Sequence, residues 1–140
     1  MTRYVNFHVP GVPIAQPRPR VTTIGGMARA YVPAKHPVHA YRASIAAAWL
    51  ELSETPFEGP ILMEVVFWFP RTKAMTWKTK PMFTTPKTSK PDIDNLFKAV
   101  ADGLEGHAYK NDSQVTGIKV EKLYVGLTNP RTDISIKEVK

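Results

Sequence analysis

Two segments of this 140-residue chain, residues 38–52 and residues 92–104, place apolar side chains three and four positions apart. That spacing gives an α-helix one apolar face and is typical of helices packed on a core. Residues 60–69, between them, form a near-continuous run of apolar side chains, which predicts a central strand buried on both faces. A chain with these three segments is expected to pack helices against a sheet.

Shorter extended segments complete the predicted sheet. They alternate apolar and polar side chains and cover residues 4–9, 115–125 and 132–139. Gly25 and Gly26 predict a hairpin between residues 20–23 and 28–32, because paired glycines supply the positive φ of tight hairpin turns. We therefore expect an α+β fold, with residues 1–140 forming a single domain that has a mixed or antiparallel sheet and two main helices.

Residues 70–91 interrupt this pattern with a long basic segment. They contain four prolines and six cationic side chains, and no apolar periodicity runs through them. Loops longer than about 15 residues are uncommon in compact domains and are usually functional or disordered. Three aromatic residues lie at or within this loop: Phe69, Trp77 and Phe83. Each of them either packs in the core or is exposed, where it could stack on bases or wedge between them.

The charge of the chain is unevenly distributed. The formal net charge is +7, and residues 1–50 and 71–90 each contain six basic side chains and no acidic one. Such segments attract nucleic acid by releasing its condensed counterions, whereas the alternative interpretation is ordinary solvated surface. Under the first interpretation, DNA phosphates contact Arg18, Arg20, Arg71, Lys73, Lys78, Lys80, Lys87 and Lys90.

The composition disfavours several classes of protein. The chain has no cysteine, which excludes disulfides, thiolate zinc sites and a cysteine nucleophile. No apolar run approaches the roughly 20 residues of a membrane span, and the N-terminus lacks a signal-peptide pattern, so we expect a cytoplasmic protein without a membrane partner. A histidine-based metal site is disfavoured, because the four histidines are scattered at His8, His36, His39 and His107.

Four of the five aspartates fall within 21 residues of this basic chain, at Asp92, Asp94, Asp102 and Asp112. Asp92 and Asp94 flank Ile93 on the apolar face of the second predicted helix, so both carboxylates are expected to turn away from the core toward one site. Asp112 follows a short connection that can fold back beside the start of the helix or the adjacent strand. Because Mg²⁺ is held by one or two carboxylates with waters and substrate phosphate, these three aspartates predict a magnesium site, with Mn²⁺ as a substitute.

Each side chain of this cluster also has a simpler interpretation. A helix cap accounts for Asp92 or Asp94, although for one of them only. Lys98 either forms an ion pair with Asp94 or stabilises charge that develops on a scissile phosphate. Asp102 either joins the site or orients Lys98. Asn95 either bonds a phosphate or a carboxylate, or stabilises the first helical turn.

Residues 90–104 (KPDIDNLFKAVADGL) and 109–115 (YKNDSQV) resemble the signature of the RusA-type Holliday junction resolvases, small endodeoxyribonucleases of bacteria and their prophages. The shared pattern is D-x-D-N-x-x-K on a helix, followed by an aspartate and then Gln-Val at the head of a strand. The order of the elements and the Pro-Arg-Pro-Arg of residues 17–20 also fit this family. The long basic loop, residues 70–91, departs from its shorter members.

The resemblance implies that Asp92, Asp94 and Asp112 bind the catalytic magnesium and that Lys98 assists at the phosphate. It also implies a homodimer that resolves four-way DNA junctions in recombination and repair, in the cytoplasm at the nucleoid, encoded by a bacterium or a phage. One or two Mg²⁺ ions would activate a water and stabilise the leaving 3′ oxygen. Two alternatives stay open: a structure-selective nuclease for forks, flaps or RNA, and a non-catalytic basic DNA-binding module.

Overall fold

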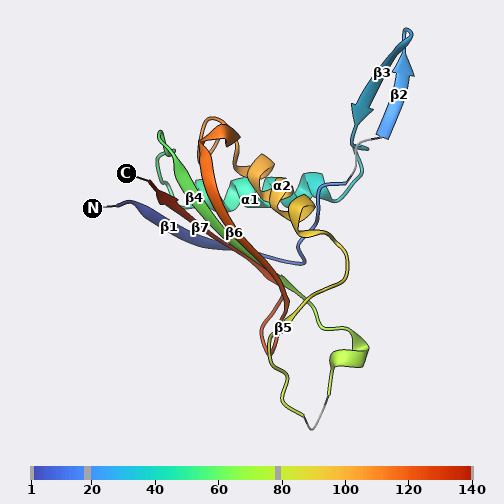
Figure 1. Cartoon of the computed structure of the whole chain (residues 1–140), viewed down its shortest axis with the longest axis vertical. Coiled ribbons are helices and arrows are strands. Elements are labelled where there is room, and N and C mark those ends of the chain that lie inside the picture. The colour runs from blue at the N-terminus through green and yellow to red at the C-terminus, as the bar shows by residue number, and fades with distance from the viewer. Residues whose placement is uncertain (1, 18–19, 78–79, 140) are drawn as a thin grey trace.

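The computed structural model describes residues 2–17, 20–77 and 80–139. Its centre is a five-stranded mixed sheet with two helices on one face, which confirms the α+β prediction (Figure 1). In their order across the sheet, the strands are β1 (Tyr4–Pro10), β7 (Arg131–Glu138), β4 (Ile61–Phe69), β6 (Val115–Tyr124) and β5 (Thr85–Pro86). The β4–β6 pair is parallel and the other three pairs are antiparallel. Strands β1, β6 and β7 confirm the three strands predicted from the alternation of apolar and polar side chains.

Strand β4 is central in the sheet, but only one of its faces is covered. Its side chains alternate between buried and more exposed positions along the strand. Leu62 is 41% exposed, and Glu64 is exposed on the same face. The prediction that this strand is buried on both faces is therefore wrong, because both helices pack on a single face. The side chains that face the helices are Ile61, Met63, Val65, Phe67 and Phe69.

The two predicted helices are confirmed. Helix α1 (Val38–Glu51) follows Pro37, and helix α2 (Ile93–Leu104) ends just before Gly106, whose φ of 83° is the left-handed conformation typical after a helix end. The helices pack on each other, α1 also against β1 and α2 against β6. Leu52, the last residue of the predicted helical segment 38–52, lies just beyond α1 and is 38% exposed. In the described residues, neither helix has the length and apolar character needed to cross a membrane.

The glycine pair forms the predicted hairpin, which extends away from the sheet (Figure 1). Its strands are β2 (Arg20–Ile24) and β3 (Met27–Tyr31), and all five residues of each are paired in antiparallel register. Gly25 and Gly26 have φ values of 59° and 81°. Both glycines therefore adopt the positive φ that the turn requires.

The described residues of 70–91, which are 70–77 and 80–91, form the predicted loop, with two short regular elements that the sequence pattern did not indicate. These are the 3₁₀ helix η1 (Lys73–Met75) and strand β5. Arg71 ties the loop to the sheet. Its half-buried guanidinium donates hydrogen bonds of 2.7, 2.7 and 3.2 Å to the carbonyl oxygens of Met75, Phe83 and Val125.

The three aromatic residues near this loop have different environments. Phe69 is 6% exposed and belongs to the core, so for this residue the core interpretation is correct. Trp77 is 40% exposed and Phe83 is 72% exposed. The Arg71 guanidinium lies 5.2 Å from the centroid of the Trp77 ring. Of these three aromatic residues, Trp77 and Phe83 are therefore the two that are accessible for stacking on a nucleic acid.

Candidate functional site

A cavity of about 370 Å³ lies between the C-terminal half of α2 and the start of β6. Its charged side chains are Lys98 and Asp102 from α2, and Asp112 from the 3₁₀ helix η2 (Asp112–Gln114) that leads into β6. Apolar residues of α2 and β6, including Phe97, complete the wall. A mostly apolar hollow with a few convergent charged groups is the usual form of a binding or catalytic site.

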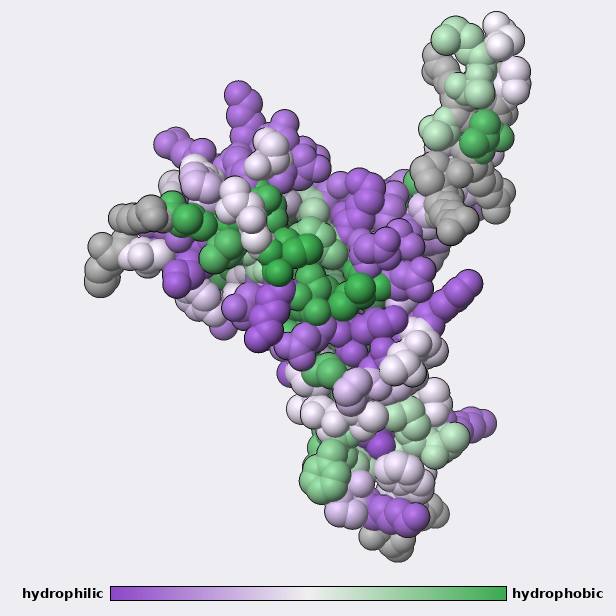
Figure 2. Space-filling model, in the orientation of Figure 1, coloured by the Kyte–Doolittle hydropathy of each residue, from purple (hydrophilic) through white to green (hydrophobic). Residues whose placement is uncertain are grey.

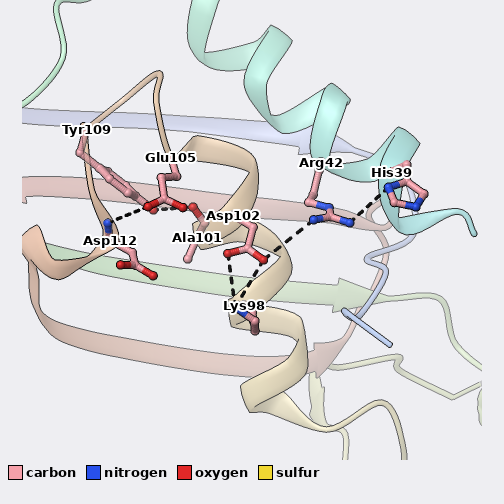
Figure 3. A network of polar contacts seen from close by, with 8 residues as sticks. All are labelled: His39, Arg42, Lys98, Ala101, Asp102, Glu105, Tyr109 and Asp112. Atoms are coloured by element: carbon pink, nitrogen blue, oxygen red, sulfur yellow. Dashed lines mark hydrogen bonds and ion pairs between the residues drawn. The ribbon is translucent and has the colours of Figure 1, made fainter. Parts of the chain in front are cut away.

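Asp102 is the centre of a charged network on this helix (Figure 3). Its carboxylate lies 3.5 Å from the Lys98 ammonium and 3.9 Å from the Arg42 guanidinium of α1. The Arg42 guanidinium in turn lies 3.2 Å from Nδ1 of His39. Of the two roles considered for Asp102, orienting Lys98 is the one that these contacts support. The described contacts pair Lys98 with Asp102 rather than with Asp94.

Tyr109 is fully buried beside the same acidic groups. Its hydroxyl donates a 2.6 Å hydrogen bond to the carbonyl oxygen of Ala101 in α2. Burial raises the pKa of Tyr109 well above its ordinary value, and the charges of Glu105, Asp112 and Asp102 raise that pKa further. Three carboxylates therefore lie around one buried hydroxyl at the C-terminal half of the helix (Figure 3).

Gln114 fixes the short helix that carries Asp112. Its side-chain amide makes four hydrogen bonds of 2.9–3.2 Å to backbone groups of Lys110, Asn111, Phe57 and Gly59. The N–H of Asp112 donates to Glu105 at 3.3 Å. Within the described part of the chain, no hydrogen bond or ion pair engages the Asp112 carboxylate itself. Asp112 is thus held by its backbone while its carboxylate is left free.

Asp92, Asp94 and Asn95 lie at the opposite end of α2. Asp92 occupies the N-cap position, but its side chain makes no capping hydrogen bond, so the cap interpretation does not account for its carboxylate. Asp94 accepts a 2.9 Å hydrogen bond from the N–H of Asn95, within the first turn. A second hollow near this end is lined by Lys90, Pro91, Asp92 and Asn95.

The three predicted metal ligands do not form one cluster within the described residues. Asp94 and Asp102 are about 12 Å apart along the helix axis at about 1.5 Å per residue, and Asp112 lies with Asp102. Among the described residues, no three Asp, Glu or His side chains lie close enough together to hold one metal ion. The expected convergence of Asp92, Asp94 and Asp112 is therefore not preformed. Ile93, moreover, is 38% exposed, so the expectation that it faces the core and directs its neighbours is wrong.

The position of Asp112 follows from the path of the chain after α2. The connection folds back on the C-terminal half of the helix, where Tyr109 contacts Ala101, rather than on its start. Asp102 and Asp112 line one cavity, and Mg²⁺ requires only one or two protein carboxylates with water and phosphate oxygens. Asp102 and Asp112 are therefore suited by their chemistry to hold a divalent ion, and the set of Asp92, Asp94 and Asp112 stays a prediction.

The predicted DNA-binding cations fall into three groups. Arg18 and Lys78 lie outside the described residues, and of Arg20 only the backbone, at the start of β2, is described. Arg71 and Lys87 are engaged by carbonyl or hydroxyl groups of the protein. The cations that are exposed on the loop are Lys73, Lys80 and Lys90.

Sequence analysis did not identify several residues that shape this site. They are Arg42, Glu105, Tyr109 and, in its structural role, Gln114. Glu105 follows Asp102 by one helical turn, which is a signal that the sequence contains. Arg42 and Tyr109 reach the site from other elements and carry no local signal.

Comparison with known proteins identifies the family to which this chain belongs. The sequence model described as "Endodeoxyribonuclease RusA" matches residues 10–137, which include both ends of α2, the η2 helix and the basic loop. The chain is also similar to the "Uncharacterized protein YqaN" of Bacillus subtilis (strain 168), with 35% identity over 140 residues and 96% of each chain covered. Because the family match covers nearly the whole chain, this protein belongs to the RusA endodeoxyribonuclease family.

Proposed function

We propose that this chain is a divalent-metal-dependent endodeoxyribonuclease that cuts four-way DNA junctions at the cavity between α2 and β6. Membership of an endodeoxyribonuclease family supports the nuclease activity. The observation that carries the location is that Asp112, Asp102 and Lys98 line one cavity. The net charge of +7 supports a polyanionic substrate.

The side chains of the cavity have distinct roles in this proposal. Lys98, oriented by Asp102, donates to a non-bridging oxygen of the scissile phosphate and stabilises the charge that develops there. Asp112 presents a carboxylate without a protein partner in the described residues. A bound Mg²⁺ ion, or Mn²⁺ in its place, would supply Lewis-acid activation of a water and of the leaving oxygen. Asp92 and Asp94 stay predicted ligands, which DNA binding would have to bring toward Asp112.

The test is cutting of a labelled synthetic four-way junction with and without Mg²⁺. Paired symmetric nicks that require Mg²⁺ are expected. Asp112→Asn should abolish cutting and retain junction binding, and Lys98→Met should slow cutting by about 10²-fold or more. The matched control is Asp133→Asn, since Asp133 lies in β7 and bonds Trp68 and Arg131 instead of lining the cavity.

The same assay separates the two possible ligand sets. If Asp92 and Asp94 are ligands, Asp94→Asn abolishes cutting as completely as Asp112→Asn, and Asp102→Asn has a smaller effect. If the pair in the cavity is sufficient, Asp102→Asn and Asp112→Asn are equivalent and Asp94→Asn is mild. Full activity in Asp112→Asn would refute the proposed site in either form.

Selectivity for junctions is tested against the rival substrates. The exposed lysines of the basic loop would bind phosphates and give affinity without sequence information. The exposed rings of Trp77 and Phe83 would stack on bases at an opened junction centre. Side-by-side cutting of four-way, flap, fork and RNA substrates distinguishes a junction resolvase from other structure-selective nucleases. A non-catalytic DNA-binding module would bind these substrates and cut none of them.

We further propose that the chain acts as a homodimer, because a four-way junction has two-fold symmetry and must be cut on two strands. The edge of β6 offers a surface for a second copy. Strand β5 covers only its end, at Leu123 and Tyr124, and no other strand of the described residues pairs with that edge. Apolar residues gather over this strand in Figure 2, and Ile118, which is 56% exposed, also lines the proposed cutting cavity, so a second copy at this edge would border that cavity. Sedimentation should detect a dimer, and a monomer bound one to one to junctions would contradict this proposal.

A further inference from the structure

Three polar side chains meet where β5 and β6 pair, outside the cavity described above. The ammonium of Lys87 lies 2.9 Å from the Ser89 hydroxyl and 3.3 Å from the Tyr124 hydroxyl. The two hydroxyl oxygens are themselves 3.2 Å apart. Each of the three groups is therefore within hydrogen-bond reach of the other two, and all three can act as donors.

This cluster is held in place by groups around it. The Lys122 ammonium donates two 2.8 Å hydrogen bonds, to the carbonyl oxygens of Ser89 and Pro91. The Lys87 ammonium also lies 4.8 Å from the centroid of the Tyr124 ring and 5.1 Å from that of Phe69. The side chains are thus positioned before any ligand binds, which lowers the entropy cost of binding.

The positive charge of the cluster is not neutralised by protein carboxylates. In the part of the chain that the structure describes, neither Lys87 nor Lys122 forms an ion pair. The hydrogen bond with Ser89, followed by that with Lys87, lowers the pKa of Tyr124 below its ordinary value. The environment of the phenol therefore favours negative charge at this position.

We propose that Lys87, Ser89 and Tyr124 together bind one backbone phosphate of the DNA. Non-bridging phosphate oxygens accept hydrogen bonds from an ammonium group and from hydroxyls, and such contacts position a duplex without reading its sequence. The site lies close in sequence to the start of α2, where Asp92 and Asp94 are located, since Ser89 precedes Asp92 by three residues. A DNA strand bound at this site would therefore be held beside the start of α2. This inference rests on the proposed function, because it takes DNA as the substrate.

The first experiment measures affinity for a four-way junction, without divalent metal, over a series of salt concentrations. Lys87→Met should weaken binding and reduce the slope of log affinity against log salt by about 0.9, because one phosphate contact is lost. Tyr124→Phe should weaken binding about tenfold through the loss of one charge-assisted hydrogen bond and leave that slope unchanged. Tyr4→Phe is the matched control, since the Tyr4 hydroxyl also bonds a serine, Ser135, at 3.1 Å, without a lysine.

A second measurement reports on the site directly. Ultraviolet titration of the phenols, with and without DNA, should show that DNA raises the pKa of Tyr124, because a phosphate adds negative charge beside it. The Tyr124→Phe variant should lack that titration. Circular dichroism confirms that each variant is folded. If Lys87→Met fails to fold, Ser89→Ala and Tyr124→Phe decide the question, since both remove a hydroxyl only.

The outcomes separate this inference from the proposed function. If Tyr124→Phe and Ser89→Ala bind the junction as the wild type does, the phosphate site is refuted, while Mg²⁺-dependent cutting by the wild type still stands. If the wild type neither binds nor cuts any DNA substrate, the proposed function fails and this inference fails with it. Equal weakening in Tyr4→Phe would mean a loss of fold stability and would also overturn the site.

Discussion

Removal of the Tyr109 hydroxyl tests how this buried side chain supports the cavity lined by Asp102 and Asp112. The hydroxyl is fully buried and donates a 2.6 Å hydrogen bond to Ala101. The Ala101 oxygen also accepts from the N–H of Glu105 at 3.1 Å, so Tyr109→Phe leaves no carbonyl without a partner. The free energy of unfolding should therefore fall by only about 1 kcal/mol. In thermal unfolding this corresponds to a decrease of about 3–5 °C in Tm.

The difference in the free energy of unfolding between the wild type and Tyr109→Phe should change with pH in a defined direction. Burial and the nearby carboxylates raise the pKa of Tyr109 in the folded state above the unfolded value of 10.0. Below pH 10 the hydroxyl is protonated in both states, so its stabilisation is fully present. Above that pH the unfolded phenol ionises first, and the wild type loses about 1.4 kcal/mol per pH unit that Tyr109→Phe does not lose. The variant should become the more stable protein before about pH 11.

Urea unfolding followed by tryptophan fluorescence, from pH 7 to pH 11, measures this crossover. Trp49 is a suitable probe because it is 1% exposed in the core. Tyr31→Phe is the control, since Tyr31 is 45% exposed and should change neither stability nor its pH dependence. A difference between wild type and Tyr109→Phe that stays constant up to pH 11 would refute the placement of this buried phenol beside the three carboxylates.

Three other substitutions test the supports of the site. Gly106→Ala should destabilise the protein by about 1 kcal/mol, because Gly106 has a φ of 83°. Gly59→Ala is the control, since both glycines have open space around them, and its thermal unfolding should change little. Gln114→Leu should lower the free energy of unfolding by about 2 kcal/mol and reduce cutting, because four backbone groups lose their hydrogen-bond partner. Normal cutting by this variant would contradict the role of Gln114 in positioning Asp112. Arg71→Met should speed chymotrypsin cleavage within residues 72–84, because the loop loses the three hydrogen bonds of the Arg71 guanidinium. Lys73→Met is the control and should not change the cleavage rate, which gel analysis of timed digests measures.

Local patterns in the sequence were sufficient for most elements of the fold. The helices at α1 and α2, the strands β1, β6 and β7 and the glycine hairpin all follow from spacing and turn chemistry, which act between near neighbours in the chain. The covered faces did not follow from these patterns. The apolar run of β4 is compatible with burial on one face or on both, and the packing of both helices on a single face decided between them.

The same distinction applies to the charged residues. Arg71 and Lys87 look like free cations in the sequence, but the fold brings carbonyl and hydroxyl oxygens to them. The position of Asp112 depends on how Tyr109 and Gln114 dock the chain that follows α2, and these contacts join segments far apart in the sequence.

The sequence by itself determined the residue types of the site: a cluster of aspartates, one lysine on the same helix, and a basic loop that suits a polyanion. Only the tertiary structure decided which of these groups share a cavity, namely Lys98, Asp102 and Asp112, and which lie at the other end of α2. The physical reason is that charge and periodicity are properties of local sequence. Proximity between a helix and the loop beyond it is set by long-range packing and by buried hydrogen bonds.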